Sequence, residues 1–211
     1  VNGQGEYSGE YYNNQNSLET ATPVTITAGE IKTINFALGR GGQITGLVTA
    51  ADTGAPLSNI VVEIYADPFA TFPIATNFTN FDGTYTTNAL NTGTYYVRFT
   101  PSRSTSNDSR NYQTLIYDDK ELPITPTPIS VINGQITSDI NGQLERGSSL
   151  SGQITETNDG RRLANIQVNL FDRHGAFVQS TTTNGTGNYF FYGLPADGYY
   201  VGTRTRTYNI S

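Results

Sequence analysis

The sequence predicts an all-β protein built from β-sandwich repeats, with about two units in the 211 residues. Short apolar runs alternate with turn residues along the whole chain, and the periodicity of an α-helix is almost absent. Thr, Tyr, Val and Ile are abundant, and these side chains fit a pleated, half-buried surface. The chain also repeats itself at an interval of about 105 residues, which is the length of a small domain.

The expected strands occur at matching positions in the two halves. In the first half they are residues 43–49, 60–65, 84–87 and 94–99, and in the second half residues 150–155, 166–171, 188–192 and 199–203. A further strand pair is expected upstream of each half, at residues 23–27 with 31–38 and at residues 128–131 with 135–144. Regularly spaced short strands with turn residues between them indicate β-sandwiches.

Matched motifs define the interval of the repeat. Gly46 returns as Gly152, 106 residues later, and Tyr96 returns as Tyr200, 104 residues later. The upstream segments also pair, with Tyr12, Pro23, Ala28-Gly29 and Ile34 matching Tyr117, Pro128, Asn133-Gly134 and Ile140. The chain therefore begins and ends at about the same phase of its repeat.

Two Gly- and Arg-containing breaks, at residues 39–42 and 145–148, suggest where one unit ends and the next begins. Residues 1–40 then represent the C-terminal strands of a unit and a candidate donor segment. Residues 41–146 represent a complete sandwich repeat. Residues 147–211 represent the N-terminal strands of a further repeat, which is incomplete in this order.

Four motifs mark the first copy, Gly-x-Ile-x-Gly-x-Val, Asp-x-Gly-x-Pro-Leu-x-x-Ile-x-Val, Asp-Gly-x-Tyr and Gly-x-Tyr-x-Val, and altered forms of them follow in the same order in the second copy. At the turn the second copy departs, with Asn184-Gly185-Thr186-Gly187 in place of Asn80-Phe81-Asp82-Gly83. The motifs and their altered forms occupy residues 42–48, 52–62, 82–85 and 93–97, and then residues 147–154, 159–168, 184–189 and 194–201. This pattern resembles the carboxypeptidase-regulatory-like repeats and is similar to the B-type repeats of collagen adhesins. The resemblance implies a transthyretin-like (prealbumin-like) or immunoglobulin-like Greek-key sandwich, tandem repetition and an extracellular or cell-surface structural role.

Composition excludes several functions. The net charge of −6 argues against nucleic-acid binding, which needs clustered Lys and Arg. The absence of Cys excludes disulfides and Cys-zinc sites. No apolar stretch is long enough for a membrane-spanning helix, so membrane insertion is not expected. The first residue is Val1, which suggests a processed form or a window on a longer protein.

No set of nucleophile, base and acid stands out, so we expect no enzymatic activity. The single histidine, His174, lies in a predicted hairpin tip, where a solvated turn is its expected role. Asp52 and Asp82 are the candidate calcium ligands, but no dense Asp-x-Asp-x-Asp loop is present, so turn formation is the favoured explanation of these residues. We expect no other cofactor.

Two further surface roles follow from residue type. A tyrosine platform could bind surface glycans or a host protein, although one of each adjacent pair should be buried in the core. Its candidate members are Tyr7, Tyr11, Tyr12, Tyr95, Tyr96, Tyr199 and Tyr200. Four Asn residues fit the N-glycosylation pattern. These candidate acceptors are Asn77, Asn107, Asn184 and Asn209.

The leading hypothesis is an extracellular structural subunit of a filament, stalk or fibre, and the alternative is an adhesive glycan- or protein-binding module. Residues 147–211 would have an open sheet edge that recruits strands. The missing strands could come from a neighbouring copy, from adjacent repeats of a longer array, or from the same chain. The apolar residues expected to enter the joint are Val24, Ile26, Ile34, Phe36 and Leu38.

Overall fold

The computed structural model describes residues 5–102, 108–118 and 126–204, and this part of the chain is almost entirely β-structure. It contains fourteen strands and the short 3-10 helix η1 (Asp108–Asn111). None of the helical structure in these ranges is long and apolar enough to cross a bilayer. The strands are β1 (Gln43–Ala50), β2 (Ile60–Tyr65), β3 (Ala75–Phe78), β4 (Thr84–Thr86), β5 (Gly93–Pro101), β6 (Leu115–Ile116), β7 (Ile129–Val131), β8 (Ile136–Thr137), β9 (Gly142–Leu144), β10 (Ser148–Gln153), β11 (Gln167–Asp172), β12 (Phe177–Thr182), β13 (Asn188–Leu194) and β14 (Tyr199–Arg204).

The chain divides into two compact units whose segments alternate along the sequence. Unit 1 consists of Val1–Thr49, Thr53–Thr100 and Leu115–Gln143. Unit 2 consists of Ala50–Asp52, Pro101–Thr114 and Leu144–Ser211. The segment 115–143 therefore belongs to unit 1, although the residues on both sides of it belong to unit 2. We call residues 115–143 the completing segment.

Unit 1 has two sheets. One has the order β3-β2-β5-β6, with β7 also paired to β5, and the other has the order β4-β1-β8, with β9 also paired to β1. The Tyr85 ring packs edge-on against Phe99 between them, with the ring centroids 5.8 Å apart. The largest fully buried side chains of this unit include Tyr85, Phe99, Ile44, Ile60, Ile64, Val48, Val62, Val97 and Val131.

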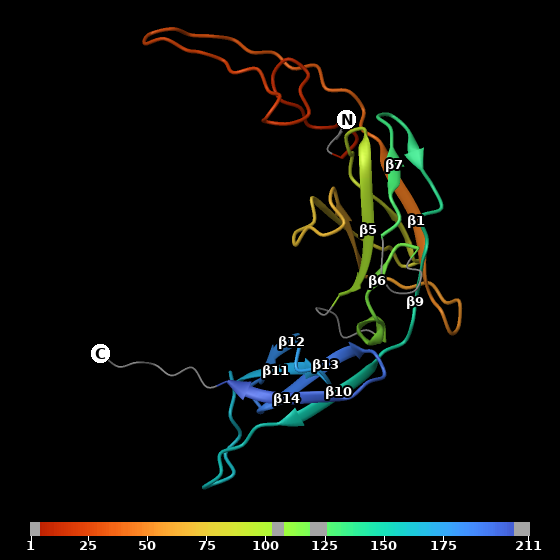
Figure 1. Ribbon diagram of the computed structural model, residues 1–211, viewed down its shortest axis with the longest axis vertical. Helices are drawn as coiled ribbons and strands as arrows, with labels where there is room; N and C mark the ends of the chain where they lie inside the picture. Colours follow the sequence, from red (N-terminus) through yellow and green to blue (C-terminus); the bar gives the residue numbers. More distant parts are fainter. Residues whose placement is uncertain (1–4, 103–107, 119–125, 205–211) are drawn as a thin grey trace. The chain divides into compact units, whose positions relative to one another are not determined.

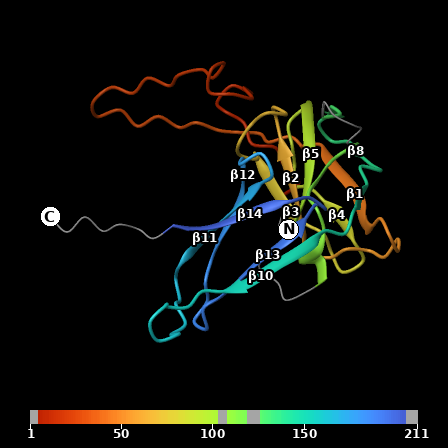
Figure 2. The ribbon, with the colours of Figure 1, turned by 60° about the horizontal axis from the view of Figure 1, so that its bottom comes forward.

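Unit 2 repeats this plan with fewer strands, and Figure 2 shows them from another side. Its sheets have the orders β12-β11-β14 and β10-β13. The buried cluster of this unit consists of Val168, Leu170, Phe191 and Leu194. In the described residues, unit 2 has no strands that correspond to β6, β7, β8 and β9 of unit 1.

The all-β class is confirmed, but individual strands differ from expectation. β3 and β12 were not expected, because their mixed polar and apolar residues give a weak alternating pattern. The expected strand at 135–144 is divided into β8 and β9, and Asp139 between them has a positive φ of 63°. The expected strand at 84–87 is confirmed as β4, one residue shorter.

The strands expected at residues 23–27 and 31–38 are absent, and the prediction of regular strands there is wrong for this chain. In Figure 1 this red-to-orange part of the chain carries no arrow. A strand is stabilised by hydrogen bonds to a neighbour, and no described segment pairs with these residues. Their sequence is suitable for strands, but the partner is missing.

Candidate assembly site

The completing segment supplies strands to both sheets of unit 1. β7 pairs antiparallel with β5, with Ser130 opposite Thr94. β8 pairs parallel with β1, with Thr137 opposite Ile44. Its apolar side chains Ile129, Val131 and Ile140 are buried. Without this segment, the core of unit 1 would be open on one side.

Polar contacts fix the position of the completing segment. The Tyr85 hydroxyl donates a buried hydrogen bond of 2.7 Å to the carbonyl oxygen of Ile140. The Ile140 N–H donates to the Thr45 carbonyl at 3.1 Å, and the Leu47 N–H donates to Asn141 Oδ1 at 2.8 Å. Burial raises the pKa of Tyr85, so its hydroxyl stays protonated as a donor.

Gly46 allows the close approach. A Cβ at this position would lie 2.0 Å from the carbonyl oxygen of Ile140, so any side chain would displace the backbone of the completing segment. The glycine that the sequence motif singled out is therefore required for the fit of two chain segments.

The arm, residues 10–38, is the repeat counterpart of the completing segment. Both contain the same turn: the Glu30 N–H donates to the Thr27 carbonyl at 3.0 Å, as the Gln135 N–H donates to the Ile132 carbonyl at 3.0 Å. The glycine that precedes each donor has a positive φ, 84° at position 29 and 75° at position 134. The arm therefore already has one local conformation of the segment that completes unit 1.

The base of the arm is anchored in the same way as the base of the completing segment. Tyr7 forms a bridge with Arg40, and Tyr112 forms the corresponding bridge with Arg146. Flanking backbone hydrogen bonds also correspond: they are Ser8 N to Gly39 O (3.1 Å) and Gly41 N to Glu6 O (3.0 Å), matched by Gln113 N to Glu145 O (2.9 Å) and Gly147 N to Asn111 O (2.6 Å). The arm leaves unit 1 as the completing segment leaves unit 2.

The apolar residues that the sequence assigned to assembly are mostly exposed in the arm. Ile26 has 62% of its surface exposed, whereas its counterpart Val131 is fully buried. Of the other four, Phe36 and Leu38 are exposed and Val24 and Ile34 are half-buried. The arm therefore exposes apolar side chains at positions where the matching segment, residues 115–143, buries them.

Two positions of unit 2 differ in burial or bonding from their counterparts in unit 1. Val201 on β14 has 42% of its surface exposed, but its counterpart Val97 on β5 has 1%. The hydroxyl of Tyr189, the counterpart of Tyr85, has no hydrogen-bond partner among the described residues. Sequence analysis did not identify this difference, although the Asp-Gly-x-Tyr motif contained the Tyr85 position. Comparing the two copies position by position would have identified Val201 and Tyr189.

The two calcium candidates have other partners. The Asp52 carboxylate accepts a hydrogen bond of 2.8 Å from Arg146 Nε in an ion pair. Asp82 accepts from the hydroxyl and the N–H of Thr84 at 2.6 and 3.1 Å, and these bonds lower the pKa of Asp82. Across residues 5–102, 108–118 and 126–204, no three His, Cys, Asp or Glu residues gather as a metal site. Calcium binding stays a prediction of the sequence.

The remaining predicted residues lie at separate places. His174 is exposed in the tip between β11 and β12, where its N–H donates to Asp172 Oδ1 at 2.8 Å. Of the glycosylation candidates, Asn184 is exposed in a turn and Asn77 is half-buried in β3. Asn107 and Asn209 lie outside the described residues.

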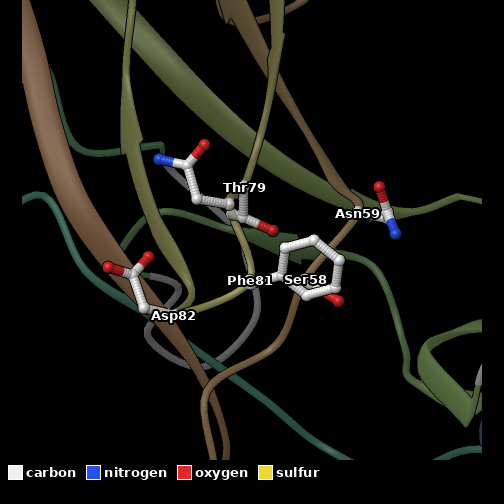
Figure 3. A pocket seen from close by; sticks show the side chains of 6 residues that line it. Ser58, Asn59, Thr79, Phe81 and Asp82 are labelled. Atoms are coloured by element: carbon white, nitrogen blue, oxygen red, sulfur yellow. The ribbon is translucent and has the colours of Figure 1, made fainter.

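One hollow of about 540 Å³ lies beside the β3–β4 turn, lined by Ser58, Asn59, Thr79, Asn80, Phe81 and Asp82. Figure 3 shows these side chains around the Phe81 ring, which is 95% exposed. The buried Thr79 hydroxyl donates to the Leu57 carbonyl at 2.6 Å, so it is used by the fold. Of the predicted tyrosine platform, Tyr7, Tyr11, Tyr12 and Tyr200 are exposed, Tyr95 is buried, and Tyr96 and Tyr199 are half-buried.

Comparison with known proteins supports the domain type. Residues 149–209 match the model of the carboxypeptidase regulatory-like domain. The resemblance noted in the sequence is therefore confirmed for the second copy. No curated protein is similar enough to the chain to count as a match.

A comparison with solved structures finds several to which the chain is similar, and three of them follow. The Bacillus anthracis TIE protein is 17% identical over 77% of this chain and 28% of its own, with a TM-score of 0.33. A streptococcal ancillary pilin is 10% identical over 86% of this chain and 60% of its own, with a TM-score of 0.38. The shaft pilin SpaA of Lactobacillus rhamnosus GG is 10% identical over 77% of this chain and 87% of its own, with a TM-score of 0.33. The chain thus spans less than two thirds of the first two.

Proposed function

We propose that the protein is a non-enzymatic, extracellular structural subunit that assembles head-to-tail into a surface filament by strand complementation. The arm of one copy would complete unit 2 of the next copy. One observation carries this proposal: the completing segment belongs to unit 1 although its flanks belong to unit 2. The arm is the repeat counterpart of the completing segment. Unit 2 is the repeat counterpart of unit 1, which the completing segment completes.

The connectivity favours an open polymer. The arm and unit 2 are different surfaces of one chain, so each contact joins two unlike surfaces. Each added copy therefore leaves a free arm at one end of the filament and a free unit 2 at the other end. Full burial of each apolar side chain contributes about 1.5–3 kcal/mol, before the cost of ordering the arm is subtracted. Several such side chains make a stable joint plausible on energetic grounds.

Two isoleucines of the arm provide a matched test. Ile26 corresponds to the fully buried Val131, whereas Ile31 corresponds to Ile136, which stays exposed in β8. Both isoleucines are exposed in the free arm, so neither Ile26→Asp nor Ile31→Asp should disturb folding of the subunit. We expect Ile26→Asp to abolish filaments in electron micrographs and sedimentation, and Ile31→Asp to assemble like the wild type.

Wild-type chains that stay monomeric at every concentration tested would reject assembly between copies. A monomer whose arm amides are protected from hydrogen exchange would indicate that the arm closes onto its own chain instead. Equal assembly of the two Asp variants would show that the arm is not the joint.

Binding of surface glycans or host proteins is a second candidate function. The exposed Phe81 ring beside a polar hollow favours it, because sugar rings stack on exposed aromatic faces. A glycan array probed with the wild-type chain tests this candidate, and the absence of any bound glycan would count against it.

A further inference from the structure

We propose that Phe36 of the arm and Thr203 of unit 2 form the contact that makes assembly directional, so that an arm enters unit 2 and not unit 1. This inference rests on the proposed assembly and adds its register and its specificity. It follows from a difference between the two copies of the repeat, at one pair of positions that meet in the completed unit.

In unit 1 these positions hold a large and a small residue. Phe99 on β5 is fully buried, and a Cβ at Gly142 would lie 2.8 Å from the Phe99 ring. The aromatic ring therefore occupies the space where a side chain at 142 would be. Close packing of this kind leaves no room for a larger residue on the completing segment.

In the arm and unit 2 the two sizes are exchanged. The counterpart of Gly142 is Phe36, and the counterpart of Phe99 is Thr203 on β14. Thr203 is exposed, and Phe36 is exposed beside the Tyr12 ring in an edge-to-face arrangement, with 6.5 Å between the ring centroids. The Phe36 ring would fill the space left by the smaller Thr203 side chain. The pair therefore keeps about the same volume, although the ring comes from strand β5 in unit 1 and from the arm in the proposed joint.

This exchange also prevents the wrong pairing. An arm inserted into unit 1 would place the Phe36 ring where the Phe99 ring already lies, and two rings cannot share that space. A completing segment inserted into unit 2 would place Gly142 opposite Thr203 and leave a cavity. The two joints of a filament are therefore not interchangeable.

Polar groups of unit 2 fit the same register. The Tyr189 ring packs edge-on against Phe191 at 5.8 Å, and its hydroxyl corresponds to the Tyr85 hydroxyl that donates to Ile140. In the proposed register it donates to the carbonyl of Ile34. Gly152, the counterpart of Gly46, removes the Cβ that would obstruct that carbonyl.

A size-exchange experiment tests the contact. Phe36→Gly should leave a cavity and Thr203→Phe should obstruct the arm, and each should weaken association by about 100-fold. The double variant Phe36→Gly with Thr203→Phe recreates the pair of unit 1 and should recover most of the affinity. Both residues are exposed in the free chain, so circular dichroism of the monomers should be unchanged.

Cysteine pairs report the register directly, because the chain has no cysteine of its own. In unit 1, Ser130 lies opposite Thr94. The repeat counterparts of these two residues are Thr25 in the arm and Gly198 in unit 2, so the proposed register places Thr25 opposite Gly198. Thr25→Cys with Gly198→Cys should therefore form disulfide-linked ladders when oxidised with diamide. The control pair Thr27→Cys with Gly198→Cys lies two residues out of register, beyond the reach of a disulfide.

The outcomes separate this inference from the proposed function. Rescue by the double variant together with crosslinking through position 25 supports the register. Filaments that crosslink through position 27, or a double variant whose defect is the sum of the single defects, would overturn the register while leaving strand complementation intact. Wild-type assembly of both Ile26→Asp and Ile31→Asp would overturn both.

Discussion

Units 1 and 2 share a sequence plan but differ in completeness. Val97 and Val201 are the same residue type at the same repeat position, yet the first is 1% exposed and the second 42%. The strand that carries each valine is regular in both units. The difference is caused by a segment remote in sequence, which is present in the sheets of unit 1. Burial in this protein is therefore determined by which strands pair, and residue type alone does not determine it.

The largest effect should come from removing a core side chain of the completing segment. Ile140→Ala should lower the free energy of unfolding of the monomer by about 2–5 kcal/mol, because Ile140 is buried in unit 1. Ile34→Ala, the same change in the half-buried arm, should cost less than about 1 kcal/mol and should weaken assembly instead. Urea unfolding checks both variants, at protein concentrations where sedimentation shows only monomer. Equal losses of unfolding free energy in the two variants would contradict the difference in burial between the completing segment and the arm.

A smaller effect is expected from adding one methyl group. Gly46→Ala places a Cβ 2.0 Å from the backbone oxygen of Ile140 and should cost about 1–3 kcal/mol of monomer stability. At Gly152 the nearest atoms belong to the Tyr189 side chain, which can move, so Gly152→Ala should be milder in the monomer. Thermal unfolding compares the two. A Gly152→Ala chain that assembles normally would contradict close approach of the arm at this position.

The smallest effect should come from deleting one hydroxyl. Tyr85→Phe leaves the buried carbonyl of Ile140 without this donor and should cost about 1–2 kcal/mol in the monomer. Tyr189→Phe should leave monomer stability unchanged, because its hydroxyl has no partner among the described residues, and should weaken only assembly. Paired unfolding and sedimentation measurements test this. A loss of monomer stability in Tyr189→Phe would show that unit 2 already uses the hydroxyl.

Much of the fold could be predicted from residue patterns. The strands expected at residues 43–49, 60–65 and 94–99 are present as β1, β2 and β5. The edge strands β3 and β12 were missed because edge strands alternate less strictly and tolerate polar residues on both faces. The arm was expected to form strands because its residues match β7 to β9. The pattern was correct for the segment, but local sequence does not specify whether a pairing strand is within reach.

The candidate site was predicted on one side only. Val24, Ile26, Ile34, Phe36 and Leu38 were selected as assembly residues from their alternation. Ile26, Phe36 and Leu38 are exposed and Val24 and Ile34 are half-buried, and their role in assembly stays a prediction. The acceptor positions Val201, Thr203 and Tyr189 carry no signal in isolation, because an exposed valine or threonine on a strand is ordinary. They stand out only against their buried counterparts in unit 1.

The sequence by itself determined the all-β class, the interval of the repeat and the equivalence of residues 10–38 with residues 115–143. These features depend on alternation, turn residues and motif spacing, which are local and can be counted. Only the tertiary structure decided which strands of residues 115–143 pair with β1 and β5, and that residues 10–38 form no regular strands. The physical reason is that strand pairing joins segments remote in sequence, and an apolar strand face specifies that it must be covered without specifying by which segment.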